Sequence, residues 1–132
     1  MGGATTGRMG GSTSFGAIPI IGCYGGTGGA FMAGTTAVAC SAGGAGGAVS
    51  INGDINAGGS PGEEGSRIAA LVAFSGNGGD SLFGGGAVGK ITATTGADAI
   101  GYGSGGSGGR SASTAQNGGS GANGLIIVLE FA

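Results

Sequence analysis

The chain has 132 residues, of which 39 are glycine, and it contains no Trp and no His. Four basic residues against six acidic ones give a net charge of −2, which argues against nucleic-acid binding because no basic patch can neutralise a phosphate backbone. No apolar run approaches the ~18 residues of a membrane span, and the start lacks the features of a secretory signal, so we expect synthesis in a cytoplasm and no membrane insertion.

The glycines are clustered as doublets one residue apart, at 25–29, 43–47 and 105–109. Glycine is costly to order and has no side chain to bury, and the chain has few large apolar residues to compensate. We therefore expect the peptide groups of neighbouring extended segments to hold the fold together. The predicted fold class is all-β, a glycine-rich layered β/polyproline II sandwich with little or no helix.

Two parts are expected along the chain. Residues 1–14, rich in Gly, Ser and Thr, are expected to form an extended N-terminal arm. This arm must be ordered by contacts with other parts of the protein or its partners. Residues 15–132 form a glycine-rich β/polyproline II domain. The first expected strand of this domain covers 15–24, and Pro19 confines it to a sheet edge or a strand start.

Apolar stretches then alternate with glycine stretches at an interval of about 20 residues. The apolar stretches lie at 37–40, 48–51 and 68–74. A short helix over 63–74 is an alternative for the last of them, although Gly65 and the β-branched end favour a turn followed by a strand. Asn-Gly pairs at 52–53 and 123–124 indicate turns, the first of them in a hairpin.

Residues 125–131 form the most clearly predicted strand of the chain. The side chains of one face are those of Leu125, Ile127, Leu129 and Phe131. The other face is also apolar as far as Glu130. We therefore expect this strand to lie in a sheet interior or at a subunit interface.

Glycine recurs at every third position along four short tracks, and three residues is the period of a polyproline II helix. The tracks are Gly22, Gly25 and Gly28; Gly43 and Gly46; Gly103, Gly106 and Gly109; and Gly118, Gly121 and Gly124. A bare face of this kind lets extended helices pack closely and bond through their N–H and C=O groups. Valine at Gly106 is expected to disrupt that packing and to lower the thermal midpoint.

The residues do not suggest a reaction centre, and we predict no enzymatic activity and no cofactor. Without His, no Ser-His-Asp triad can form and a metal site would lack ligands. The glutamates at 63–64 are expected to be a solvated turn rather than an acid and base pair. Residues 101–106 resemble a dinucleotide-binding loop through their glycines alone. Cys23 and Cys40 are expected to be buried thiols, with a disulfide as the alternative.

Four motifs follow one another along the chain. An apolar stretch leads into glycines at 20–29, and Gly-Asn-Gly-Gly-Asp-Ser-Leu-Phe-Gly follows at 76–84. Gly-Tyr-Gly-Ser-Gly-Gly lies at 101–106, and Gly-Ala-Asn-Gly opens an apolar segment with an acidic residue at 121–131. In this order, residues 15–131 resemble the glycine-rich domain at the C-terminus of bacteriophage tail fibres.

The resemblance implies a virion structural protein, made in the host cytoplasm and assembled as a homotrimer at the end of a fibre. Its implied partners are other virion proteins and a bacterial surface receptor, either a glycan or an outer-membrane protein. A capsid decoration, collar or vertex protein with no receptor role is an alternative. An ice-binding glycine-rich protein, which also packs polyproline II helices, is a further alternative from another class.

Receptor contact uses exposed aromatic, amide and charged side chains on loops. The candidate residues are Tyr24, Phe31, Tyr102, Arg110, Gln116 and Asn117. Core or interface packing is the alternative for the first two, and plain solvation for the last three. Packing or subunit contact is expected of Gly103, Gly106, Gly109, Leu125, Ile127, Leu129 and Phe131.

Overall fold

The computed structural model of the chain describes residues 12–15, 21–23, 39–41, 43–47, 55–69, 72–111 and 116–130. These residues contain no helix. The strands among them are β1 (Thr13–Phe15), β2 (Ile21–Cys23), β3 (Ala39–Ser41), β4 (Gly65–Ala69) and β5 (Val72–Phe74). The non-helical character predicted from the glycine content is therefore confirmed for the described part of the chain.

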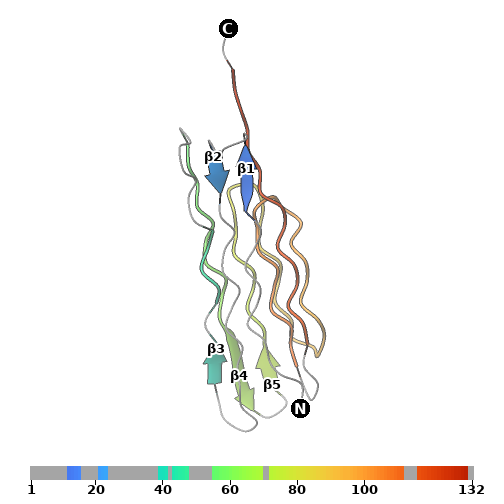
Figure 1. Ribbon diagram of the computed structural model, residues 1–132. Helices are drawn as coiled ribbons and strands as arrows, with labels where there is room; N and C mark the ends of the chain where they lie inside the picture. Colours follow the sequence, from blue (N-terminus) through green and yellow to red (C-terminus); the bar gives the residue numbers. More distant parts are fainter. Residues whose placement is uncertain are drawn as a thin grey trace.

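The strands form two small antiparallel sheets at opposite ends of an elongated bundle (Figure 1). In one sheet, β1 pairs with β2, with Ser14 opposite Gly22. In the other, β4 lies between β3 and β5, and its register against β5 is irregular between Arg67 and Ala69. Thr13 and Ser14, which were expected in an extended arm, therefore belong to a sheet.

The predicted alternation of strands and glycine stretches is found at two places. β3 precedes the glycine run 43–47, and β5 leads into the glycine-rich run 75–80. The single strand predicted for 68–74 is wrong, and so is the alternative of a short helix over 63–74, because the stretch is divided between β4 and β5, which pair with each other. Its centre reads Ala-Ala-Leu-Val, which contains no turn residue. The strand predicted at 48–51 and the turn predicted at 52–53 lie outside the described residues.

Extended runs connect the two ends of the bundle and lie side by side (Figure 1). Their backbone bonds recur at every third residue: the N–H of Ser60 donates to the C=O of Asp80 at 2.9 Å, and the N–H of Glu63 donates to the C=O of Asn77 at 3.0 Å. A β-strand repeats every two residues, whereas a polyproline II helix repeats every three. The bonding pattern therefore matches the polyproline II part of the expectation.

Residues 104–110, here called the central run, bond to four other runs. The residues that meet the central run in backbone bonds include Gly79, Ala87, Ala97 and Gly119. Two serines of the central run, Ser104 and Ser107, are only 2% exposed, and they are separated by the same three-residue step. The centre of the described bundle is therefore made of backbone and small polar side chains.

Within residues 12–15, 43–47, 55–69, 72–111 and 116–130, large apolar side chains do not fill the interior. Ala87, at 9% exposure, is the one buried hydrophobic residue of these ranges. Ile100 and Ile55 are 98% and 90% exposed. Since apolar burial is small, hydrogen bonds between peptide groups must supply much of the cohesion, at about 0.5–1.5 kcal/mol net for each.

Glycine is required where neighbouring runs approach most closely. A Cβ added to Gly78 would lie 1.9 Å from the carbonyl oxygen of Gly105, and one added to Gly106 would lie 2.4 Å from the carbonyl of Gly119. Equally tight positions on the predicted tracks are Gly43, Gly46 and Gly109. At these positions the backbone of the next run occupies the place of a side chain.

The last predicted glycine track, Gly118, Gly121 and Gly124, is tight at Gly124 alone, and Gly119 rather than Gly118 makes the close contact at its start. A Cβ on Gly119 would lie 1.9 Å from the carbonyl oxygen of Ala97, whereas Gly118 and Gly121 would reach an ordinary contact distance of 3.4 Å. Both residues of the doublet at 118–119 are glycine, so the sequence alone does not reveal which of them faces the neighbouring run. Gly103 differs again, because its φ of 74° marks a turn rather than a packing contact.

Polar side chains complete the bonding between the runs 75–80 and 84–90. The N–H of Gly86 donates to Oδ1 of Asp80, and the N–H of Gly89 donates to Oδ1 of Asn77, both at 2.6 Å. The two acceptors are three residues apart, as are the two donors. Asn77 also donates through Nδ2 to Oε2 of Glu63 at 2.6 Å, so its side chain joins three runs.

Replacing Asn77 with alanine is expected to lower the free energy of unfolding by about 1–2 kcal/mol, because the partly buried N–H of Gly89 loses its acceptor. Chemical denaturation measures this change. Asn123→Ala is the matched control, since the exposed side chain of Asn123 bonds none of the described residues. Equal stability of the two variants would contradict the role given to Asn77.

The strand predicted at 125–131 is wrong over the part that the structure describes, because residues 125–130 belong to neither sheet. The turn predicted at 123–124 is also wrong, since the chain continues there in extended form. The C=O of Asn123 accepts a bond from the N–H of Gly103 at 2.6 Å. A Cβ on Gly124 would lie 2.3 Å from Oγ1 of Thr13, so the run passes β1 closely.

Beyond Gly124 the run extends past the end of the bundle (Figure 1). Leu125, Ile127 and Leu129 are 36%, 59% and 75% exposed, so they do not lie in a sheet interior. Their expected role at a subunit interface stays a prediction. Phe131 lies outside the described residues.

Candidate interaction surface

The turns 81–84 and 100–103 carry apolar side chains at one end of the bundle. Phe83 and Tyr102 face each other in an isolated antiparallel bridge. The hydroxyl of Ser81 fixes this arrangement by donating to the C=O of Tyr102. The exposed residues of the two turns, here called the apolar turn cluster, are Leu82, Phe83, Ile100 and Tyr102.

Three of the predicted receptor-contact residues are brought together at the opposite end of the central run. Arg110 and Thr94 exchange backbone bonds of 3.0 and 3.1 Å. A Cβ on Gly109 would lie 2.3 Å from the carbonyl oxygen of Asn117 and 3.1 Å from Cβ of Gln116. The polar end, defined as Arg110, Gln116 and Asn117, therefore brings these three residues together, with Asn117 exposed and the other two half-buried.

Tyr102 does not belong to this polar end. Tyr102 lies in the turn before the central run, whereas Arg110 lies at the far end of that run, six residues after Ser104. Since a polyproline II helix rises about 3.1 Å per residue, the run alone spans about 19 Å. The four candidates therefore form two separate surfaces rather than one site. Tyr24 and Phe31 lie outside the described residues.

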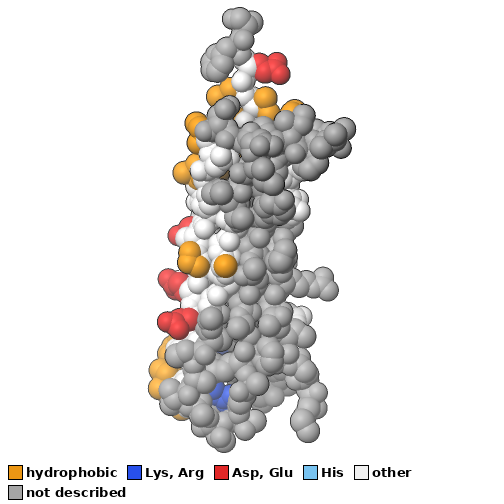
Figure 2. Space-filling model, turned by 60° about the vertical axis from the view of Figure 1, so that its left-hand side comes forward, with side chains coloured by type: hydrophobic (Ala, Val, Ile, Leu, Met, Phe, Trp, Pro, Cys, Tyr) orange, Lys and Arg blue, Asp and Glu red, His pale blue; other side chains and the backbone are white. Residues whose placement is uncertain are grey.

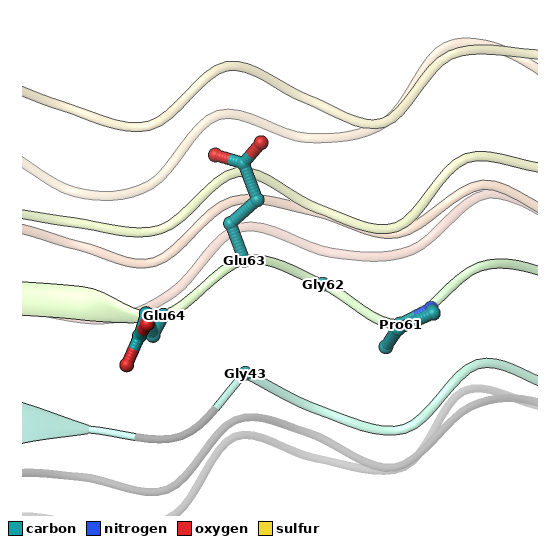
Figure 3. Close-up of a pocket in the computed structure, with 5 residues that line it drawn as sticks. All are labelled: Gly43, Pro61, Gly62, Glu63 and Glu64. Atoms are coloured by element: carbon teal, nitrogen blue, oxygen red, sulfur yellow. The ribbon is translucent and has the colours of Figure 1, made fainter.

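A shallow, open groove of about 630 Å³ lies beside the two glutamates (Figure 3). Its lining residues are Gly43, Pro61, Gly62, Glu63 and Glu64. Glu63 points toward the neighbouring run, where its carboxylate accepts the bond from Asn77, whereas Glu64 points to the other side of its own run (Figure 3). Both residues are exposed, as predicted, but they precede β4 in an extended run and not in a turn.

A second groove, of about 290 Å³, lies between the runs 84–90 and 94–100. Its lining residues are Gly85, Gly86, Ala87, Val88, Lys90, Ala97, Asp98 and Ile100. Lys90 and Asp98 contribute opposite charges. The carboxylate of Asp98 is already engaged, because Oδ1 accepts a bond from the N–H of Ser120 at 2.6 Å.

The visible surface alternates between apolar and acidic groups. Figure 2 shows hydrophobic side chains at several levels of the elongated body, with acidic side chains between them and more hydrophobic ones near the end from which the C-terminal run extends. Within the described ranges, no group of three or more Cys, Asp or Glu residues could hold a metal ion. Those ranges also contain no helix long and apolar enough to cross a membrane.

Comparison with known proteins gives no relative: no protein-family model, no curated protein and no solved structure matches the chain.

The apolar turn cluster contains three residues that sequence reasoning did not select, Leu82, Phe83 and Ile100. A signal for the first two was present. Leu82 and Phe83 follow Asp80 and Ser81 between glycine stretches, and large apolar residues in such a turn have no interior to enter when the interior is backbone. Ile100 carries no comparable local signal, because its exposure depends on how the runs pack.

Proposed function

We propose that this chain is a non-enzymatic structural protein of a bacteriophage virion, a tail-fibre or tail-tip protein that contributes to attachment at the host surface. The order of the glycine motifs supports this proposal, and so does the way in which the bundle is built. A body held by peptide groups keeps its outward side chains free for contact with partners.

The proposed fold is a layered β/polyproline II sandwich that assembles as a homotrimer and contacts other virion proteins. The proposed receptor is a bacterial surface glycan or an outer-membrane protein. The observation that carries the proposal is the reversal of the usual arrangement of an apolar interior and a polar surface. Glycine lies where the runs meet, while Ile100 and other large residues face outward. Neither groove gathers a set of groups suited to catalysis.

Asn117→Ala is expected to weaken binding of the purified chain to susceptible cells by about tenfold, as truncation of one contact residue does at an interface. The polar end is favoured because the exposed side-chain amide of Asn117 can exchange hydrogen bonds with a glycan. Labelled protein titrated onto cells measures the affinity. Tyr102→Ala, at the other end of the central run, is expected to bind within about twofold of the parent.

Loss of binding in Tyr102→Ala with Asn117→Ala unchanged would move the receptor contact to the apolar turn cluster. Unchanged binding in both, and in Arg110→Ala, would contradict receptor contact by these residues. Immunolabelling of particles adds a second test, because a position on the shell instead of a fibre would favour a decoration, collar or vertex protein.

One observation favours the ice-binding alternative as a second candidate. The three-residue bonding step is more extensive than the interrupted glycine tracks suggest, since Asn77 and Asp80 continue it through their side chains. Polyproline II runs bonded in this way can present regular faces. Thermal hysteresis of the purified chain would favour this candidate over attachment, whereas ordinary freezing behaviour would remove it.

A further inference from the structure

The segment Leu125–Leu129, here called the C-terminal apolar segment, has five consecutive apolar residues. It follows the last backbone bonds between this run and the other described residues, which are those of Ala122 and Asn123 to the turn at 101–104. Ile127, Val128 and Leu129 are 59%, 47% and 75% exposed. The segment leaves the bundle at the end that carries the apolar turn cluster (Figure 1).

The residue types of this segment favour a β-strand rather than continued polyproline II structure. Ile126, Ile127 and Val128 are β-branched, and such residues are enriched in strands. Large residues would also prevent the close approach that glycine permits between runs. An isolated apolar strand exposes unpaired N–H and C=O groups together with its side chains, which makes it a template for pairing with another strand.

The accessible surface of the chain supports a missing partner. The single chain exposes 8601 Å². A folded monomer of its mass, 11.8 kDa, exposes about 5,900 Å² on average. The excess is about 2,700 Å², and it is larger than the about 800 Å² that one subunit buries in a stable interface.

We propose that the C-terminal apolar segment pairs with the same segment of a second copy of this chain. This inference rests on the oligomer in the proposed function and deepens it by assigning the contact to Leu125–Leu129. A second copy is the favoured partner because both faces of the segment are apolar. Each copy can therefore bury its own apolar side chains against those of the other copy. The first charge after the segment, on Glu130, is exposed and can remain in water.

The test compares the full-length chain with Ile127→Glu by sedimentation velocity over a range of micromolar concentrations. The parent is expected to be oligomeric, and the variant is expected to dissociate with a dissociation constant at least about 30-fold higher, as loss of a central interface residue produces. Ile91→Glu is the matched control. Ile91 is 73% exposed, and it lies near the Thr94–Arg110 bridge at the opposite end of the bundle, so its variant is expected to associate as the parent does.

Hydrogen exchange gives a second readout, because it shows whether this segment is the part of the chain that is covered in the oligomer. Amides of 125–130 are expected to be protected in the parent at high concentration and to exchange freely in Ile127→Glu. A parent that stays monomeric at about 100 μM, well above the Kd of a stable interface, would overturn the proposal. So would an oligomer in which these amides remain unprotected. Failure of cell binding, by contrast, would count against the attachment function and not against this contact.

Discussion

Gly119→Ala is expected to lower the free energy of unfolding by about 3 kcal/mol, at the upper end of overpacking effects. The added Cβ would lie 1.9 Å from the carbonyl oxygen of Ala97, and a backbone atom cannot swing aside as a side chain does. The two runs must therefore separate, which weakens the nearby bond from Gly119 to Ser107. A drop in Tm of about 10 °C by calorimetry is the corresponding observation.

Gly118→Ala provides a control one residue away in the same run. Its Cβ would lie 3.4 Å from the nearest neighbour, the carbonyl oxygen of Ser107, so the methyl group fits. The substitution also reduces the freedom of the unfolded chain, which stabilises a protein by about 0.4–1 kcal/mol where the backbone is compatible. Opposite shifts in Tm are therefore expected for adjacent glycines. Similar losses in both variants would show that the register of this run is not as described.

Ser107→Ala is expected to destabilise the protein by about 1–3 kcal/mol, the cost of leaving a buried donor without a partner. The Oγ of Ser107 accepts the N–H of Ala97 at 2.8 Å, and the residue is 2% exposed. Alanine at position 107 leaves the partly buried N–H of Ala97 without this acceptor. Chemical denaturation gives the change in free energy.

Ser104→Ala is the matched comparison, since Ser104 is equally buried in the same run. Its hydroxyl donates to the C=O of Gly101, which also accepts the backbone N–H of Ser104 at 3.2 Å. Removal of the hydroxyl therefore leaves the acceptor bonded, and a loss below about 1 kcal/mol is expected. Equal losses for the two serines would indicate that side-chain volume, rather than the Ala97 bond, sets the stability of the centre.

The mode of cohesion was predictable from the sequence because it depends on composition. Many glycines, few large apolar residues and a three-residue glycine step indicate packing through the backbone, and Gly43, Gly46, Gly106 and Gly109 have the predicted tight contacts. Which glycine of the 118–119 doublet contacts the neighbouring run was not predictable. There, both residues lack a Cβ, and the choice between them is made by the neighbouring run.

The strand predictions failed where the pattern depends on a partner. The continuous apolar residues at 125–129 are typical of a strand that is buried on both faces. A strand also needs a neighbour that bonds to it, however, and the sequence does not show whether one is present. The pairing of β4 with β5 was missed for a related reason, since the apolar stretch between them carries no turn signal.

The candidate surface was predicted by residue type but not by arrangement. Tyr102, Arg110, Gln116 and Asn117 were selected as exposed side chains on loops, with no prediction of which of them lie together. The central run, which spans about 19 Å, separates the end that carries Tyr102 from the end that carries Arg110. The reach of an extended run is a property of the fold, so it could not be obtained from residue spacing before the runs were assigned.

The order of the runs along the chain has a consequence for biosynthesis. The central run bonds to runs on both sides of it in sequence, including 75–80 and 84–90, which the ribosome makes earlier. Those earlier runs cannot complete their bonds until residues 104–110 have emerged. Contacts between distant parts of a chain also form slowly. We therefore expect the runs 75–80 and 84–90 to remain hydrated and open in the nascent chain until residues 104–110 have been made, and then to close around them.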